Sequence, residues 1–517
     1  MTQFLKNTLQ GVKARFGKIR PIKKMTDEQP LRAELFSLDQ LELHAKILAE
    51  KHTVSFKRGQ DKLLSRLKEN EEIVLRTYEL LNEAGKAKRR ISPAGEWLLD
   101  NYYLIEEQIG LAQKYLPKGY SRELPNLIRG PLAGYPRVYA MAMEIVSHGD
   151  GRLDIKGLTG FVSAYQTIKH LKLGELWAIP IMLRLALIEN LRRVSLRMML
   201  TQMDRDKAEY WASRILEVSA KDTNDVVLEI ASMAKDDLPM SSAFVAEFVR
   251  RLYGQSSTLN LSLIWLEKKL SEQEETIDRL IQATSREQAA DQVSIANTIE
   301  SLRLLEGTNW HDFVEELSVV ERILKQDPSG DYGLMSFATR DRYRHVIEKL
   351  SVRSKRPEEE VASQVVRLAA EAQALTGRQD VTAHVGYYLM DQGLGQFHRS
   401  LGLRLPLSES LPAKKTALPL TVYLGSIVFI TFAATAPALF LAWNGGLQRW
   451  PGLVLFGFPL LFVTSQTAIS LVNWVSTLLI KPKKLPKMDF SEGIPARAYV
   501  GGYSFHAQRR ASRGIAD

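Results

Sequence analysis

Residues 418–441 read LPLTVYLGSIVFITFAATAPALFL, two dozen positions without a charged side chain. A helix of this length, at about 1.5 Å per residue, can cross a hydrocarbon core of about 30 Å. A second uncharged run at residues 451–480 is longer than one crossing requires, so it is expected to tilt, to kink at Pro459 or to begin in the membrane interface. The two runs predict a two-helix transmembrane hairpin at residues 413–481, with spans at about 418–441 and 453–480.

Basic residues are concentrated at the two outer ends of this hairpin. The turn between the spans holds Arg449, whereas the outer ends hold Lys414, Lys415, Lys481, Lys483, Lys484 and Lys487. Because lysine and arginine are retained on the cytoplasmic side of a membrane, both ends are expected to face the cytoplasm. This topology predicts a multi-pass protein whose N- and C-termini are cytoplasmic.

Polar residues recur on one face of the second span at steps of four, three and four: Gln466, Ser470, Asn473 and Thr477. Amide side chains are costly when they face lipid, so this polar face is expected to contact other helices. One interpretation is that it forms hydrogen bonds between packed helices. The other is that it borders a polar passage shared with further transmembrane helices.

The composition indicates a largely soluble, globular protein in front of the hairpin. The chain has 517 residues, of which 25% are charged, and it has no cysteine, which excludes disulfides, thiolate metal sites and cysteine nucleophiles. The net charge of +10 comes from the ends, because residues 1–24 hold seven basic and no acidic residues and residues 481–517 hold eight basic and three acidic ones. The nearly neutral remainder predicts no nucleic-acid partner.

The region before the hairpin shows helical rather than strand periodicity. Leu63, Leu67, Val74, Tyr78 and Leu81 lie on one helical face, and apolar residues follow the same spacing elsewhere. The fold class is therefore predicted to be mostly α, a cytoplasmic multi-helix bundle or irregular helical array followed by the transmembrane hairpin. The expected segments are a basic amphipathic N-terminal segment (1–30), two helical regions (31–250 and 251–412), the hairpin (413–481) and a basic cytoplasmic tail (482–517).

Two local patterns help to place the soluble helices. Ser92 followed by Pro93 predicts a helix start, because a hydroxyl caps the first turn and proline fits its first position. Residues 173–191 form the most apolar soluble segment, but charged residues interrupt it, so it is predicted to be a buried helix rather than a third span. In residues 1–30, one apolar and one basic face allow either contact with membrane lipid or packing within the protein.

The motifs that would indicate an active site are weak. Asp204 and Asp206 form a D-x-D pattern, but they lie in a predicted helix, and His44 and His52 share a helical face without a nearer ligand pair. No Gly-rich phosphate loop is found in the sequence. The charged run at residues 340–344 could bind an anion, although internal ion pairs are the favoured interpretation. No catalytic, cofactor-binding or metal-binding residue is therefore assigned.

Several strings taken together resemble the amino-terminal region of cyclic β-1,2-glucan synthases, which are large glucosyltransferases of the bacterial inner (plasma) membrane. The strings are PAGEWLLDN at 93–101, GELWAIP at 174–180, RLALIENL at 184–191, SFATRDRYR at 336–344, HVGYYL at 384–389 and LPKMDFSEGIP at 485–495. The resemblance implies an origin in a polytopic enzyme that polymerises glucose from UDP-glucose with a divalent metal ion. Its glycosyltransferase domain would begin just after residue 495.

Residues 499–517 do not read as the strand with which that domain would start. The leading hypothesis is that the chain, as a truncated or frameshifted product or half of a split gene, supplies the helical and membrane-anchoring part and is inactive alone. No cofactor is then expected in this chain. The alternative is a non-enzymatic, membrane-anchored helical scaffold that docks a separately encoded synthase. Expected partners are membrane lipid, further transmembrane helices or a separately encoded catalytic domain.

Overall fold

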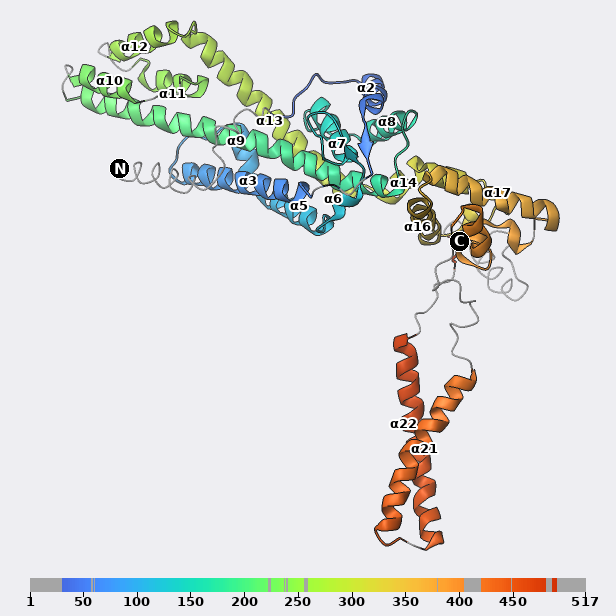
Figure 1. Ribbon diagram of the computed structural model, residues 1–517. Coiled ribbons are helices and arrows are strands. Elements are labelled where there is room, and N and C mark those ends of the chain that lie inside the picture. The colour runs from blue at the N-terminus through green and yellow to red at the C-terminus, as the bar shows by residue number, and fades with distance from the viewer. Residues whose placement is uncertain are drawn as a thin grey trace, which may run out of the picture. The chain divides into compact units, whose positions relative to one another are not determined.

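The computed structural model shows a chain that is mostly helical (Figure 1), which confirms the predicted fold class. It describes residues 30–56, 59, 61–221, 225–236, 238, 240–254, 259–378, 380–403, 420–447, 449–479 and 486–490. Within these ranges the one sheet pairs two short antiparallel strands, β1 (Val54–Ser55) and β2 (Asn126–Leu127). The amphipathic segment expected at 1–30 and the tail expected at 482–517 lie outside the described residues, except for residues 30 and 486–490.

The contacts between residues divide the chain into two compact units, the first ending at Ser318 and the second beginning at Val319. Helices on both sides of residue 250 share one core, and the division that the sequence suggested at this residue stays a prediction. The first unit contains α2 (Leu38–Lys51), α3 (Leu63–Lys86), α4 (Pro93–Asp100), α5 (Tyr102–Tyr115), α6 (Tyr120–Glu123), α7 (Arg137–His148), α8 (Ile155–Gln166), α9 (Leu173–Ser219), α10 (Asp225–Lys235), α11 (Ser242–Leu252), α12 (Asn260–Ser271), α13 (Ile277–Gly307) and α14 (Trp310–Leu317).

The second unit has a small helical core and the two apolar helices. Its core is formed by the helices at residues 319–400, which come before the two apolar helices. The elements are α15 (Val319–Leu324), η3 (Tyr332–Leu334), α16 (Phe337–Ser354), α17 (Glu358–Thr376), η4 (Val381–Ala383), α18 (Val385–Met390), α19 (Leu394–Ser400), α21 (Leu420–Asn444) and α22 (Trp450–Leu479).

Helix α9 organises the first unit. It runs for 47 residues, and α3, α7, α11 and α13 pack along it. Its first half is the predicted buried helix, because nearly every side chain up to Val194 is buried. The predicted start of α4 is also confirmed: Ser92 accepts a hydrogen bond from the Gly95 amide at 3.2 Å, and Pro93 occupies the first turn.

Helices α21 and α22 lie side by side as a hairpin (Figure 1). Each is long and apolar enough to cross a membrane. The α22 helix begins at Trp450, three residues before the expected span, and its 30 residues extend for about 45 Å, which exceeds a hydrocarbon core of about 30 Å. Between the helices, the hydroxyls of Thr435 and Thr464 form a hydrogen bond of 2.8 Å, and Ala468 and Val472 are buried.

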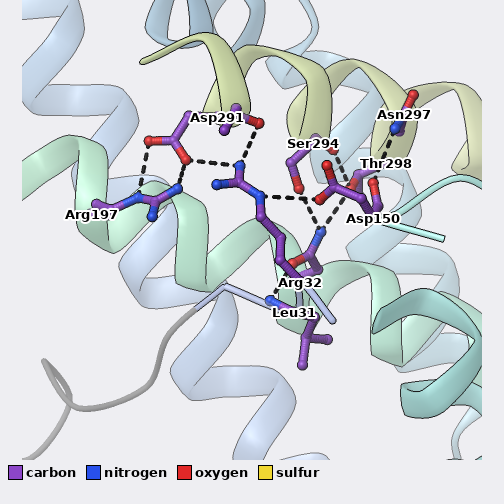
Figure 2. A network of polar contacts seen from close by, with 10 residues as sticks. Leu31, Arg32, Asp150, Arg197, Asp291, Ser294, Asn297 and Thr298 are labelled. Atoms are coloured by element: carbon purple, nitrogen blue, oxygen red, sulfur yellow. Dashed lines mark hydrogen bonds and ion pairs between the residues drawn. The ribbon is translucent and has the colours of Figure 1, made fainter. Parts of the chain in front are cut away.

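Polar side chains tie the start of the described chain to α9 and α13 (Figure 2). Arg32 contacts Asp150 at 3.2 Å and Asp291 at 3.0 Å, and Arg197 of α9 donates to the same Asp291. Asn190 of α9 accepts from the Leu31 amide and donates to two hydroxyls of α13. Three segments distant in sequence are therefore held together by groups that would be costly to bury alone.

The carboxylate of Glu189 lies at the centre of a second buried network. Its side chain is 1% exposed, and it accepts hydrogen bonds from Arg66 at 2.7 and 2.9 Å and from Arg192 and Arg193 at 2.9 Å each. Burial raises the pKa of Glu189, but the hydrogen bonds from Arg66 and the surrounding arginine charges outweigh it, so the pKa lies well below the ordinary value of 4.5. Glu189 therefore stabilises the fold above pH 4.5, and this contribution is lost as the pH falls.

The substitution Glu189→Gln is expected to lower the free energy of unfolding of the first unit by about 3–5 kcal/mol, because it leaves buried arginines without their countercharge. Denaturant unfolding of the purified chain at pH 7 would measure this. The matched control is Glu69→Gln, whose side chain is 40% exposed and contacts the same Arg66 at 3.3 Å; it should cost less than about 1 kcal/mol. Equal effects of the two substitutions, or an effect of Glu189→Gln that does not shrink below pH 4.5, would contradict this assignment.

Candidate functional site

The candidate site of the second unit is a docking site for the segment after the hairpin. We call residues 487–489 the return segment, because they come after α22 in sequence and contact the residues around the start of α16. Three of the strings that carry the family resemblance, at 336–344, 384–389 and 485–495, contribute residues to it. The site therefore brings together residues that are 148 positions apart in the sequence, Thr339 and Lys487.

A buried aspartate shapes the turn that precedes α16. The Oδ2 atom of Asp327 accepts hydrogen bonds from His384 Nδ1 at 2.8 Å and from Ser329 Oγ at 2.6 Å, and its Oδ1 atom accepts from the Val385 amide at 3.0 Å. Burial raises the pKa of Asp327, but hydrogen bonds from His384, Ser329 and Val385 outweigh it and lower the pKa below 3.8. The carboxylate thus stays ionised and joins the 327–332 turn to the start of α18.

A second carboxylate, Glu321 of α15, holds the first two turns of α16. It accepts a hydrogen bond from the Tyr332 hydroxyl at 2.6 Å and pairs with Arg340 at 2.7 Å and Arg344 at 2.8 Å. Burial raises the pKa of the Tyr332 hydroxyl, and the nearby Glu321 raises it further. The charged run of α16 therefore forms the internal ion pairs that the sequence favoured over an anion site.

The return segment binds next to this turn through hydrogen bonds of its backbone. The Ser336 amide donates to the Lys487 carbonyl at 2.8 Å, and the Asp489 amide donates to the Leu334 carbonyl at 2.8 Å. The Lys487 amide donates to Thr339 Oγ1 at 2.9 Å. Met488 pairs with Met335 as an antiparallel bridge and packs on the core of the second unit. The chain that leaves the hairpin is thus fixed at a defined point of this unit.

The predicted polar face of α22 lies on the exposed side of the hairpin. Gln466, Ser470, Asn473 and Thr477 are all exposed. Asn473 accepts a hydrogen bond from the Tyr423 hydroxyl of α21 at 2.8 Å, and Thr477 donates to the Trp474 carbonyl at 2.7 Å. A role of this face toward further helices stays a prediction.

The residues that sequence reasoning considered for metal or histidine chemistry have different partners in the fold. Asp204 and Asp206 lie on α9, where Asp204 accepts from Ser241 at 2.8 Å and Asp206 pairs with Arg89. His52 is buried against the Tyr165 hydroxyl at 3.0 Å, and its burial lowers its pKa to about 4. Among the described residues, His44 instead meets Glu144 and His148, in a group whose ligand atoms lie within 4.8 Å of one another.

No family model matches the chain, but one characterised protein does. The chain is 28% identical over 505 residues to the cyclic beta-(1,2)-glucan synthase NdvB of Rhizobium meliloti (strain 1021). The chain resembles a cyclic beta-(1,2)-glucan synthase. The match covers 96% of this chain and confirms the resemblance that the strings indicated, while the chain spans only 17% of the relative's length.

Sequence reasoning missed the residues on which the docking site depends. It assigned no role to residues 327–330 or to Glu321. The available signals were an Asp-Pro-Ser-Gly turn, in which aspartate and serine bond nearby amides, and a histidine immediately before a short helix. These signals identify a turn, but they do not reveal that Asp327 bonds to His384, 57 residues away.

Replacing Met488 by aspartate is expected to release the return segment, because a charge would have to enter the apolar core on which Met488 packs. Hydrogen exchange of the full chain in detergent micelles would show this as at least a tenfold loss of protection at the amides of Ser336, Lys487 and Asp489. The control Phe490→Asp places the same charge two residues away, at a side chain that is 47% exposed. The assignment fails if both variants leave these amides protected, or if the native chain shows no protection there.

Proposed function

We propose that this chain is the helical, membrane-anchoring part of a cyclic β-1,2-glucan synthase-like glucosyltransferase that uses UDP-glucose. The observation that carries the proposal is the bound return segment, because it fixes the polypeptide where it leaves the hairpin. Similarity to the synthase over nearly the whole chain supports the glucan synthase-like origin. In this role, the helical units and the hairpin hold the glucosyl-transfer machinery at the membrane surface.

The proposed location is the bacterial inner membrane, with two spans and both ends of the hairpin in the cytoplasm. Exposed leucine, phenylalanine and tryptophan side chains cover α21 and α22, which suits a lipid environment better than water. The return segment supports a common side for both hairpin ends, because the second unit both precedes α21 and binds residues that come after α22. The lysines at the outer ends favour the cytoplasmic side.

The described residues considered for metal chemistry do not fit the nucleotide-sugar and metal site that the family implies. In glycosyltransferases a D-x-D pair holds a metal ion, but Asp204 is bonded to Ser241 and Asp206 to Arg89 and Gln202 within a helical packing. We therefore assign UDP-glucose and a divalent metal to the enzyme as a whole. The contribution of this chain is anchoring and positioning.

The polar face of α22 favours a second candidate function, a scaffold that docks a separately encoded synthase. Gln466 and Ser470 present exposed amide and hydroxyl groups on α22, and such groups pair with other helices inside a membrane. The two candidates differ in whether the glucosyltransferase is covalently joined to this chain or recruited by it.

Membranes from cells without their own synthase, incubated with labelled UDP-glucose, test the proposal. We expect no β-1,2-glucan from this chain alone, because it supplies anchoring and positioning, and we expect product from a chimera in which it replaces the aligned region of the rhizobial synthase. In the chimera, Met488→Asp should reduce product at least fivefold, and Phe490→Asp should not. Glucan made by this chain alone, or a chimera that inserts into the membrane without making glucan, would contradict the proposal. Equal product from separately expressed parts would favour the scaffold.

A further inference from the structure

We propose that His44, Glu144 and His148 form a binding site for a divalent transition metal, with Zn²⁺ as the best fit. His44 comes from α2, and Glu144 and His148 are one turn apart on α7. The ligand atoms of all three lie within 4.8 Å of one another. This site belongs to the first unit and is independent of the docking site and of glucosyl transfer.

The distances between the ligand atoms suit a tetrahedral ion. His44 Nε2 lies 3.0 Å from Glu144 Oε2, and His148 Nε2 lies 3.5 Å from the same oxygen. Zinc bonds of about 2.1 Å at tetrahedral angles place neighbouring ligand atoms about 3.4 Å apart. The two distances to the carboxylate oxygen therefore lie close to this value, and all three ligand atoms lie within 4.8 Å of one another.

The surroundings of His148 orient it as a metal ligand. Its Nδ1 atom bonds to the Glu34 carbonyl at 2.7 Å, so Nδ1 carries the proton and Nε2 presents its lone pair toward Glu144. The ring of Phe36 stacks on His148 with centroids 3.8 Å apart and meets His44 at 5.4 Å. These contacts fix both imidazoles before any ion binds.

The donor set selects the class of metal. Two imidazoles and one carboxylate suit Zn²⁺ and its first-row neighbours, whereas Mg²⁺ and Ca²⁺ prefer oxygen ligands throughout. The side chains of His44, Glu144 and His148 are 25%, 36% and 11% exposed, so an ion can enter from solvent and keep a water as its fourth ligand. The expected consequence of binding is that α2 is held to α7.

Isothermal titration of the EDTA-treated full chain in detergent micelles, first with Zn²⁺ and then with Co²⁺, tests the site. We expect one equivalent of Zn²⁺ to bind, and Co²⁺ to give the intense visible absorption of a tetrahedral complex. The double variant His44→Ala/His148→Ala should lose both signals, and Glu144→Gln, which retains the shape of the site, should weaken binding at least tenfold. The control His311→Ala removes an exposed histidine of the same unit and should change neither.

Circular dichroism of each variant will confirm that its helices have formed. The proposal is overturned if the native chain binds no Zn²⁺ at micromolar concentration, or if the double variant and Glu144→Gln bind it as tightly as the native chain. The second result would mean that the three residues form only a hydrogen-bonded cluster and that the ion binds elsewhere.

Discussion

The buried ion pairs of α9 are the constraint on which the first unit depends. A helix that is covered on nearly all sides cannot turn its charged residues to water, so each must find a partner inside the protein. Glu175 pairs with Arg137 of α7 at 2.6 Å, Glu189 pairs with Arg66 of α3, and Asn190 bonds to α13. The positions of the neighbouring helices around α9 are therefore specified by polar contacts as well as by apolar packing.

In the second unit, buried charges must likewise find partners inside the protein, and these partners fix the 327–336 loop to which the return segment binds. Glu321 and Asp327 are buried carboxylates that are satisfied by residues from three different elements. Their partners hold residues 327–336 in one conformation, and this conformation offers the backbone groups that bind the return segment. In the proposed function, the bound return segment fixes the chain after the hairpin against the second unit. Once the hairpin is inserted in the membrane, this attachment gives the catalytic part of the synthase a defined position.

Local signals in the sequence predicted where the helices form more accurately than they predicted which residues contact one another. Uncharged runs located the two apolar helices, the helical period identified the fold class, and Ser92 with Pro93 marked a helix start. Pairs such as Glu321 with Arg344, or His44 with Glu144, are far apart in sequence. Their spacing follows no helical or strand period, so the sequence pattern does not reveal them. Sequence reasoning compared His44 with His52 because they share one helix face, whereas the fold places His44 beside α7. The long extent of α9 beyond residue 191 was also not recognised as one continuous helix.

The most direct test of this account is a cysteine cross-link between Met335→Cys and Met488→Cys. The chain has no native cysteine, so the engineered pair is the only source of a disulfide. Opposed residues of an antiparallel bridge have Cα atoms about 4.5–5.5 Å apart, which lies within the range that a disulfide spans. Under mild oxidation in native membranes, the account predicts rapid loss of both free thiols in the double variant and none in either single variant. Thiols of the double variant that stay free and reactive would show that the return segment is not bound to the second unit.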